Sequence, residues 1–263
     1  MSEENNVLST QLANVSATTL QGSHYTLTRP FVVAPNDYQV KDLEKFNAAP
    51  SRIIKLLKVL DEKSFIAYFN KFSNLDSLII FDNDNFRVCG IIDSDGTDNP
   101  RWGEHKVVYS CPQSKQWKEW VGHNKSKMDQ TTFAEFIERN LQDFVSPSGT
   151  EMLELATKFN VIRTVNFRSA KRLQSGEFEF QFSEENQSGS INVPEKFAIG
   201  IVPFKNGTAY SIEARLRYRL NSGSLSLWYE LINEEDVLEA AFNDITETIT
   251  KETGESILKI FAE

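Results

Sequence analysis

Apolar residues along the chain follow two periods, and the change between them predicts an α+β fold. Before residue 160, most apolar side chains recur every three or four residues, as on the buried face of a helix. These stripes run over Val40 to Phe46, Phe65 to Phe72, Trp117 to Trp120, Phe133 to Phe144 and Met152 to Phe159. Apolar runs on both sides of Asp82-Asn83-Asp84-Asn85 have the pattern of a hairpin, and the runs at 53–60 and 105–110 favour short strands. We therefore predict a helical N-terminal half with a small β-hairpin.

After residue 160, apolar and polar residues alternate, as in strands of a sheet with one buried face. Residues 161–182 predict a long hairpin, and residues 210–231 predict a second one. Between them, residues 184–190 are predicted to form a polar loop and residues 197–203 a further strand. A helix is predicted to begin after Asn233 and to break or bend at Gly254. We therefore predict a hairpin-rich antiparallel sheet in the C-terminal half, followed by a terminal amphipathic helix.

Composition places the chain among cytoplasmic globular proteins. Residues 1–28 are rich in Ser, Thr, Asn and Gln, so we expect a flexible polar arm there and a single α+β domain over residues 29–263. With 40% hydrophobic and 25% charged residues, the chain has enough apolar surface for a core. No run approaches the roughly 18 apolar residues of a membrane span, and the polar start lacks a signal-peptide pattern. Two cysteines are too few for a disulfide framework. We expect no membrane partner.

The charge is unevenly distributed, and two basic clusters stand out. Residues 230–263 hold ten acidic and two basic side chains, a local charge of −8, out of a net charge of −9 for the whole chain. Bidentate guanidinium groups gathered on one face of a strand can bind phosphates. Ion pairs with Glu177, Glu179, Glu230 or the acidic terminal helix are the alternative, and they are favoured for the second cluster. The candidate ligand-binding residues are Arg163, Arg168, Lys171 and Arg172 in the first cluster and Arg215, Arg217 and Arg219 in the second.

Signs of catalysis or cofactor binding are weak. The loop from Asp93 to Asn99 offers carboxylates for a divalent cation, but Gly96 stands at the wrong position for an EF-hand. The cysteines and histidines lack the paired spacing of structural zinc sites, and no nucleophile elbow, phosphate loop or dinucleotide fingerprint occurs. Trp102, Trp117 and Trp120 are interleaved with lysines, but core packing is favoured over base stacking. We predict no catalytic residues, no metal and no cofactor, and these features favour a protein that is not an enzyme while leaving an enzyme as an alternative.

Several short segments, in a fixed order, carry a resemblance to a known family. These segments are Phe31 to Pro35 with Tyr38, Ala49 to Arg52, Ser64 to Tyr68, Trp102 with His105, Trp117 with Trp120, Gln130 with Phe133 to Glu138, and Glu213 to Arg219. From about Arg29 onward, the chain resembles the YfdQ-like family of bacteriophage and prophage proteins, a domain of unknown function. The resemblance implies a phage-encoded protein in the cytoplasm of a bacterial host, in families often encoded near early, recombination or replication genes. It implies no catalytic residues.

Together these observations favour a non-enzymatic accessory protein that binds nucleic acid or a nucleotide through the basic strand from Arg163 to Arg172, helped by the strand from Arg215 to Arg219. The alternative is a protein-interaction or assembly module, either a homo-oligomer or an inhibitor of a host defence factor. A metal-dependent enzyme that uses Asp93, Asp95 and Asp98 is the third hypothesis. We expect self-association, because exposed hairpin edges need covering and a second subunit can cover them.

Overall fold

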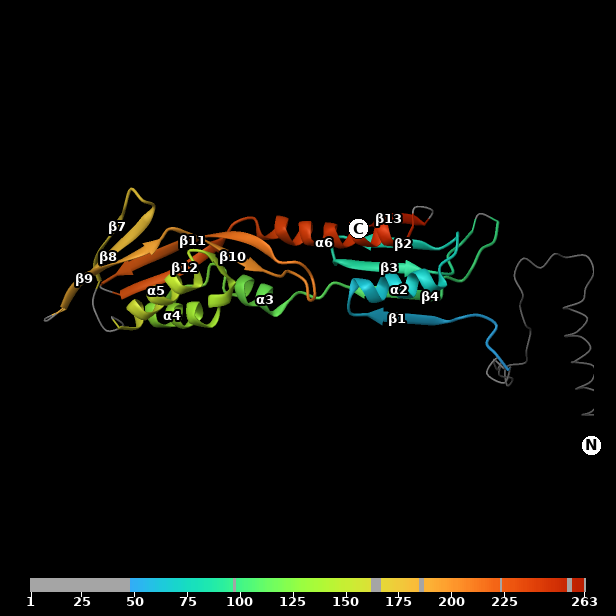
Figure 1. Cartoon of the computed structure of the whole chain (residues 1–263), viewed down its shortest axis with the longest axis horizontal. Coiled ribbons are helices and arrows are strands. Elements are labelled where there is room, and N and C mark those ends of the chain that lie inside the picture. Colours follow the sequence, from blue (N-terminus) through green and yellow to red (C-terminus); the bar gives the residue numbers. More distant parts are fainter. Residues whose placement is uncertain are drawn as a thin grey trace, which may run out of the picture. The chain divides into compact units, whose positions relative to one another are not determined.

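A computed structural model of the chain describes residues 48–96, 98–161, 167–184, 187–222, 224–254 and 257–262 (Figure 1). Contacts divide the chain into two compact units, residues 1–53 and 54–263, and the helices and strands described below belong to the second. The predicted polar arm and the predicted helix at residues 40–46 lie outside the described residues. None of the helices within the described ranges has the length and apolar character that crossing a membrane requires.

A five-stranded mixed sheet carries the first core, in the order β1-β4-β3-β2-β13. The inner pairings are antiparallel, whereas each edge strand is parallel to its neighbour. Its strands are β1 (Lys55–Val59), β2 (Leu78–Asp82), β3 (Arg87–Ile91), β4 (His105–Ser110) and β13 (Leu258–Ala262). Figure 1 shows β13, from the end of the chain, alongside β2. The sheet is therefore completed by residues almost 200 positions away in sequence.

Two helices cover one face of this sheet: α2 (Glu62–Phe72) and α6 (Glu234–Glu252). Asp61 caps α2 by accepting the backbone N–H of Ser64 at 2.8 Å, as its position before the apolar stripe predicts. Phe69 of α2 lies so close to β3 that a Cβ at Gly90 would stand 2.6 Å from Phe69 Cδ2. Only glycine therefore allows the helix this approach without repacking.

The second core lies between a five-stranded sheet and three helices. The sheet has the order β5-β12-β11-β10-β6. Its strands are β5 (Met128–Asp129), β6 (Phe144–Ser146), β10 (Lys196–Ile201), β11 (Tyr210–Asn221) and β12 (Ser224–Leu231), and its helices are α3 (Lys115–Gly122), α4 (Gln130–Arg139) and α5 (Gly149–Val161). A short 3-10 helix, η2 (Leu141–Asp143), joins α4 to β6. Buried aromatic residues from the helices and from the sheet share this core.

A third, antiparallel sheet extends the second core. It consists of β7 (Phe167–Arg172), β8 (Glu177–Glu184) and β9 (Gln187–Pro194), in that order. Phe178 and Phe180 of β8 turn inward, and both rings meet Tyr218 of β11 edge-on, with centroids 4.9 and 4.8 Å apart. Helix α6 joins the two cores, because its Leu238 packs against both.

The predicted helical N-terminal half is wrong. Between residues 54 and 110 the chain forms four strands and only one helix, and α3, α4 and α5 come in the middle of the chain. The described residues form five α-helices and three sheets, so the fold is α+β, and its C-terminal half is mostly strand. The small hairpin β2–β3 lies at the centre of a five-stranded sheet. The short strands and the hairpin have local signals in the sequence, but the pairing of β1 with β4 and of β2 with β13, which joins them into one sheet, has none.

Two further expectations in the C-terminal half are corrected. The predicted polar loop at residues 184–190 is wrong, because β9 begins at Gln187 and pairs with β8. Helix α6 is not the last element: Gly254, at φ +83°, ends it, and the chain continues into β13. A polar strand at the edge of a sheet and a short strand after a helix both lack a distinctive sequence pattern.

The second core depends on one buried carboxylate. Asp143, 2% exposed, accepts the indole N–H of Trp120 and the side-chain N–H of Gln116, both at 2.8 Å. Asp143→Ala should lower the free energy of unfolding by about 2–3 kcal/mol, because two donors lose a charged acceptor and the indole N–H is buried. Urea titration monitored by tryptophan fluorescence measures this change. The exposed Asp84→Ala variant should differ from the wild type by less than about 0.5 kcal/mol.

Candidate nucleic-acid interface

The second sheet exposes a row of arginines on the face away from its core. Ile212, Ala214 and Leu216 of β11 are buried against the helices. Side chains alternate along a strand, so Arg215, Arg217 and Arg219 extend from the opposite face, as their spacing predicts.

A tryptophan that the sequence reasoning passed over lies in the middle of this face. Trp228 of β12 stands directly opposite Arg217 in the register of the two strands and is half-buried. Lys127, just before β5, places its Nζ atom 5.4 Å from the centre of the Trp228 ring, a cation–π contact. We call the surface around Trp228 the basic face; it comprises Trp228, the cations Lys125, Lys127, Lys196, Arg215, Arg217 and Arg219, and the carboxylates Glu213 and Glu230. Alternation along β12 places Trp228 on this face, but its pairing with β11 was needed to find it.

Part of the basic face is neutralised by an internal ion pair. Arg217 Nε donates to Glu230 Oε2 at 3.0 Å. This hydrogen bond is the main reason that the pKa of Glu230 lies below its ordinary value, and the Trp228 side chain and the charge of Lys125 lower the pKa further. Of the two functions considered for the second basic cluster, phosphate binding or an internal ion pair, Arg217 therefore has the ion pair.

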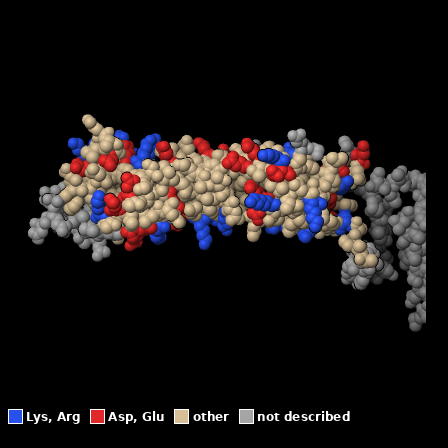
Figure 2. All heavy atoms as spheres, in the orientation of Figure 1, with Lys and Arg blue, Asp and Glu red and all other residues tan. Residues whose placement is uncertain are grey.

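Two arginines of the row lie outside this ion pair, although Arg215 stands opposite Glu230 in the β11–β12 register. Arg215 and Arg219 are exposed, and no salt bridge to a carboxylate within the described ranges includes either of them. Lys196 approaches Glu213 only to 3.8 Å, and both side chains are more than half exposed, so water screens this pair. The basic face thus keeps an excess of positive charge. Across the molecule, Figure 2 shows basic and acidic side chains intermingled on the side in view.

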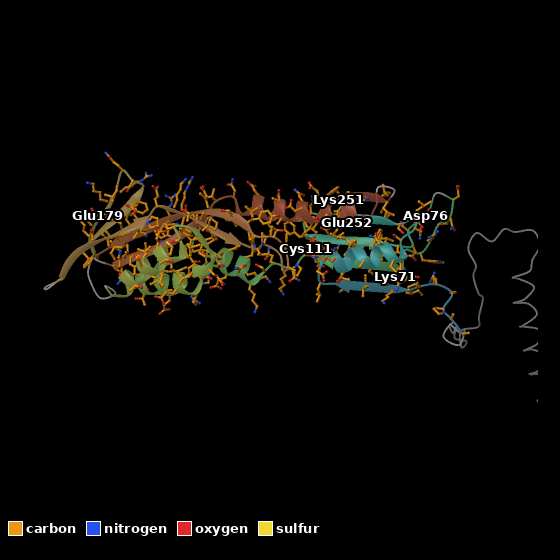
Figure 3. All side chains as sticks on the ribbon, in the orientation of Figure 1. Lys71, Asp76, Cys111, Glu179, Lys251 and Glu252 are labelled. Carbon is orange, nitrogen blue, oxygen red and sulfur yellow. The ribbon has the colours of Figure 1, made fainter. Side chains whose placement is uncertain are left out.

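The first basic cluster is described only in part. Arg163 lies outside the described residues; Arg168 belongs to β7, but its side chain is not described. Lys171 stands opposite Glu179 in the β7–β8 register, and Figure 3 marks Glu179 on β8. Arg172 donates to Glu195 at 2.5 Å, a partner that the sequence analysis did not foresee. Both described cations of this cluster therefore have a carboxylate nearby.

Glu195 also connects the two basic clusters. Its carboxylate binds Arg172, while its backbone carbonyl accepts the N–H of Leu216 in β11 at 2.8 Å. This residue lies between β9 and β10, where the third sheet meets the second. The structure thereby brings Arg172 next to the strand that holds Arg215 and Arg217, although the clusters are more than 40 residues apart in sequence.

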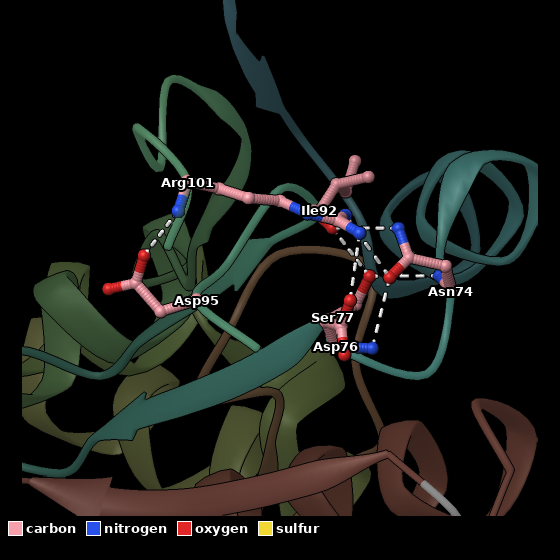
Figure 4. A network of polar contacts seen from close by, with 6 residues as sticks. All are labelled: Asn74, Asp76, Ser77, Ile92, Asp95 and Arg101. Carbon is pink, nitrogen blue, oxygen red and sulfur yellow. Dashed lines mark hydrogen bonds and ion pairs between the residues drawn. The ribbon is translucent and has the colours of Figure 1, made fainter. Parts of the chain in front are cut away.

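The carboxylates of Asp93 and Asp95 in the Asp-rich loop accept hydrogen bonds from backbone N–H groups of the nearby chain. Asp93 accepts the backbone N–H groups of Glu104 and His105 at 3.0 and 2.7 Å. Asp95 accepts the backbone N–H of Arg101 at 2.6 Å, and the Arg101 guanidinium binds Asp76 at 2.8 Å (Figure 4). Within the residues that the structure describes, no group of three or more Asp, Glu, His or Cys side chains is placed to hold a metal ion.

Trp102, Trp117 and Trp120, which are close together in the sequence, lie in different environments in the structure. Trp117 and Trp120 are buried in the second core, which agrees with the packing interpretation. Trp102, by contrast, is 76% exposed. The three tryptophans therefore form no common stacking surface.

Two cavities are lined by residues outside the basic face. One, of about 530 Å³, is bordered by Asp84, Glu235 and Glu239, with Phe86 and Phe242 among its other walls. The other, of about 210 Å³, lies between the start of α2 and α6, where Glu62 and Asp244 outnumber Lys63. The carboxylates of both cavities repel phosphate groups.

The fold and this site together define an α+β protein with an exposed, partly neutralised basic sheet face. The chain belongs to a family described as an uncharacterized conserved protein (DUF2303), whose members' common pattern matches residues 4–260. No curated protein and no solved structure matches the chain.

The ion pair at the centre of the basic face yields a pH prediction. Arg217→Ala should raise the pKa of Glu230 toward its ordinary value, which carboxyl chemical shifts in an NMR titration would report. Because the folded pKa of Glu230 is depressed, its contribution to stability is present above the unfolded pKa and is lost as the pH falls through the folded pKa. The variant should therefore lose less stability on acidification. Arg219→Ala is the control, since Arg219 stands opposite Ser226 and should leave the Glu230 titration unchanged.

Proposed function

We propose that the protein binds single-stranded nucleic acid across the basic face. The observation that carries this proposal is Trp228, a half-buried ring on the side of the sheet away from the helices, between Arg217 and Lys127. Aromatic rings among cations are the means by which proteins bind single strands without sequence preference. Trp228 would stack on a base while Arg215 and Arg219 bind phosphates on either side.

The spacing along β11 suits a polymeric ligand. Arg215, Arg217 and Arg219 recur at every second residue, or roughly every 6.7 Å along the strand, which is about two base steps of a stacked strand. The face is built on a sheet surface, and the cavities of 530 and 210 Å³ lie elsewhere and carry carboxylates. Neither of these cavities is lined by a residue of the basic face, so an extended strand that lies across the sheet is the better ligand.

Electrostatics limit the expected affinity. The net charge of −9 opposes the approach of a polyanion, and Glu230 already occupies Arg217. Local attraction by the remaining cations must overcome this repulsion. Binding should therefore be moderate and should weaken steeply as salt is added.

The resemblance to YfdQ-like phage and prophage proteins supplies a setting for this activity. We infer a non-enzymatic accessory protein, made from a phage genome in the bacterial cytoplasm, where replication and recombination expose single strands. Membership of an uncharacterized family is compatible with this setting and assigns no chemistry of its own.

A second candidate function, an assembly module, is favoured by a different observation. The edge strand β13 is apolar, and its Leu258, Ile260 and Phe261 are exposed. Binding to a host protein, including a defence factor, belongs to the same class.

A fluorescence titration tests the binding proposal. In a Trp102→Phe background, Trp228 is the one partly exposed indole, because Trp117 and Trp120 are buried. An oligothymidylate should quench this fluorescence. The logarithm of the binding constant should fall linearly with the logarithm of the salt concentration, and we call the gradient of this line the salt slope. The double variant Arg215→Ala with Arg219→Ala should reduce the salt slope by about 1.4, since each phosphate contact on a single strand contributes about 0.7.

In an anisotropy assay with labelled oligonucleotide, Trp228→Ala should weaken binding at least about fivefold, through the loss of stacking.

The matched control removes the same kind of charge from another surface. Lys115 and Lys118 are exposed on α3, which packs against the opposite side of the sheet. Replacing both with alanine should leave the salt slope unchanged. Equal losses in both double variants, or no quenching in the parent at low salt, would refute binding at the basic face.

A further inference from the structure

We propose that two copies of the chain associate by antiparallel pairing of their β13 edge strands. This strand, Leu258–Ala262, pairs with β2 on one side and is the last strand of its sheet. Every second backbone N–H and C=O of such a strand points away from its neighbour and offers hydrogen bonds to another strand.

β13 differs from the other sheet edges in lacking protection. Very short strands, prolines and lysines are the usual means by which edges avoid pairing. β5 and β6 have only two and three residues, β1 and β7 each contain at least two cations, and β9 is polar and ends in Pro194. β13 has a single charge, Lys259, and its Nζ donates to the carbonyl of Gly254 in the same chain at 2.5 Å. Within the described residues, β13 therefore carries none of these protections apart from this engaged lysine.

The side chains of β13 are apolar and accessible on both faces. Leu258 and Phe261 are 59% and 60% exposed, and Ile260 is 39% exposed. Phe261 continues the core side of the sheet, where its ring lies 5.0 Å from that of Phe81. Leu258 and Ile260 continue the opposite side, in register with Leu78 and Ile80 of β2. A partner strand would cover apolar surface above and below the sheet.

The five residues of β13 are complementary to themselves in one register. A two-fold axis perpendicular to the sheet keeps the same residues on the same face in both copies. With the axis at Ile260, Leu258 meets Ala262 of the other copy and Lys259 meets Phe261, so the cation lies beside an aromatic ring. Centring the axis on Lys259 would place two like charges directly opposite each other. Charge and strand length therefore select the Ile260 register and a second copy of this chain as the occupant.

Light scattering of purified protein tests the association. The wild type should show about twice the 30.0 kDa mass of the chain, and Ile260→Lys should show the mass of one chain, because two lysines would face each other across the axis. Leu56→Lys is the matched control: Leu56 is 59% exposed in β1, at the other edge of the same sheet, so this variant should keep the doubled mass. A wild type with the mass of a single chain, or a doubled mass in Ile260→Lys, would overturn the proposal.

Disulfide trapping tests the register without disturbing the fold. In a Cys89→Ser background, Ile260→Cys should form a covalent dimer under mild oxidation, because opposed residues of antiparallel strands have Cα atoms about 4.5–5.5 Å apart. Leu258→Cys should not, since its two copies would be offset by four residues, or about 13 Å. A mixture of Leu258→Cys and Ala262→Cys should cross-link. This register would be excluded if Leu258→Cys formed a covalent dimer with itself, or if neither Ile260→Cys nor the mixture of Leu258→Cys and Ala262→Cys cross-linked.

Discussion

Within the described residues, the helices that cover each large sheet pack against one of its faces, and the surface chemistry follows from that constraint. In β11, Ile212, Ala214 and Leu216 fill the core, so the residues that alternate with them are placed on the open side. That side carries arginines in the second sheet, whereas in the first sheet it carries Leu78, Ile80 and Ile260. One structural rule thus produces two surfaces of opposite character. A polar ligand suits the first surface, and a partner strand suits the margin of the second.

Local patterns in the sequence predict local structure, and the remainder depends on distant pairing. The two long hairpins and the Asp61 cap follow from turn residues and alternation, because the interacting residues are near neighbours. β13 could not be predicted, because a short apolar run after a helix becomes a strand only when β2 is beside it. The site shows the same division. The spacing of the β11 arginines in the sequence indicates that they share one face. That Trp228 lies among them follows only from the register between β11 and β12. The Arg172–Glu195 ion pair likewise forms only because the second and third sheets meet.

The acidic helix and the basic face do not neutralise each other, which matters for any anionic ligand. Arg217 pairs with Glu230 on the adjacent strand, and no salt bridge among the described residues joins the β11 arginines to α6. Three carboxylates of α6 lie away from the basic face: Glu235 and Glu239 border the larger cavity, and Asp244 accepts the hydroxyl of Tyr210. Glu234, at the start of α6, accepts the side-chain N–H of Asn124, which precedes Lys125 of the basic face. Cations on the second sheet can act on a phosphate backbone while the protein as a whole remains acidic.

The proposed nucleic-acid binding and edge pairing reinforce each other without any shared residue. The basic face belongs to the second sheet and β13 to the first, with α6 packing against both cores between them. A two-fold dimer would present two basic faces, and a strand long enough to reach both would bind the second at a raised effective concentration. Ile260→Lys should then weaken binding to long single strands while leaving short oligonucleotides unaffected, because the contacts within each face stay intact. Equal affinity of the monomeric variant and the dimer for long strands would mean that the two faces act independently.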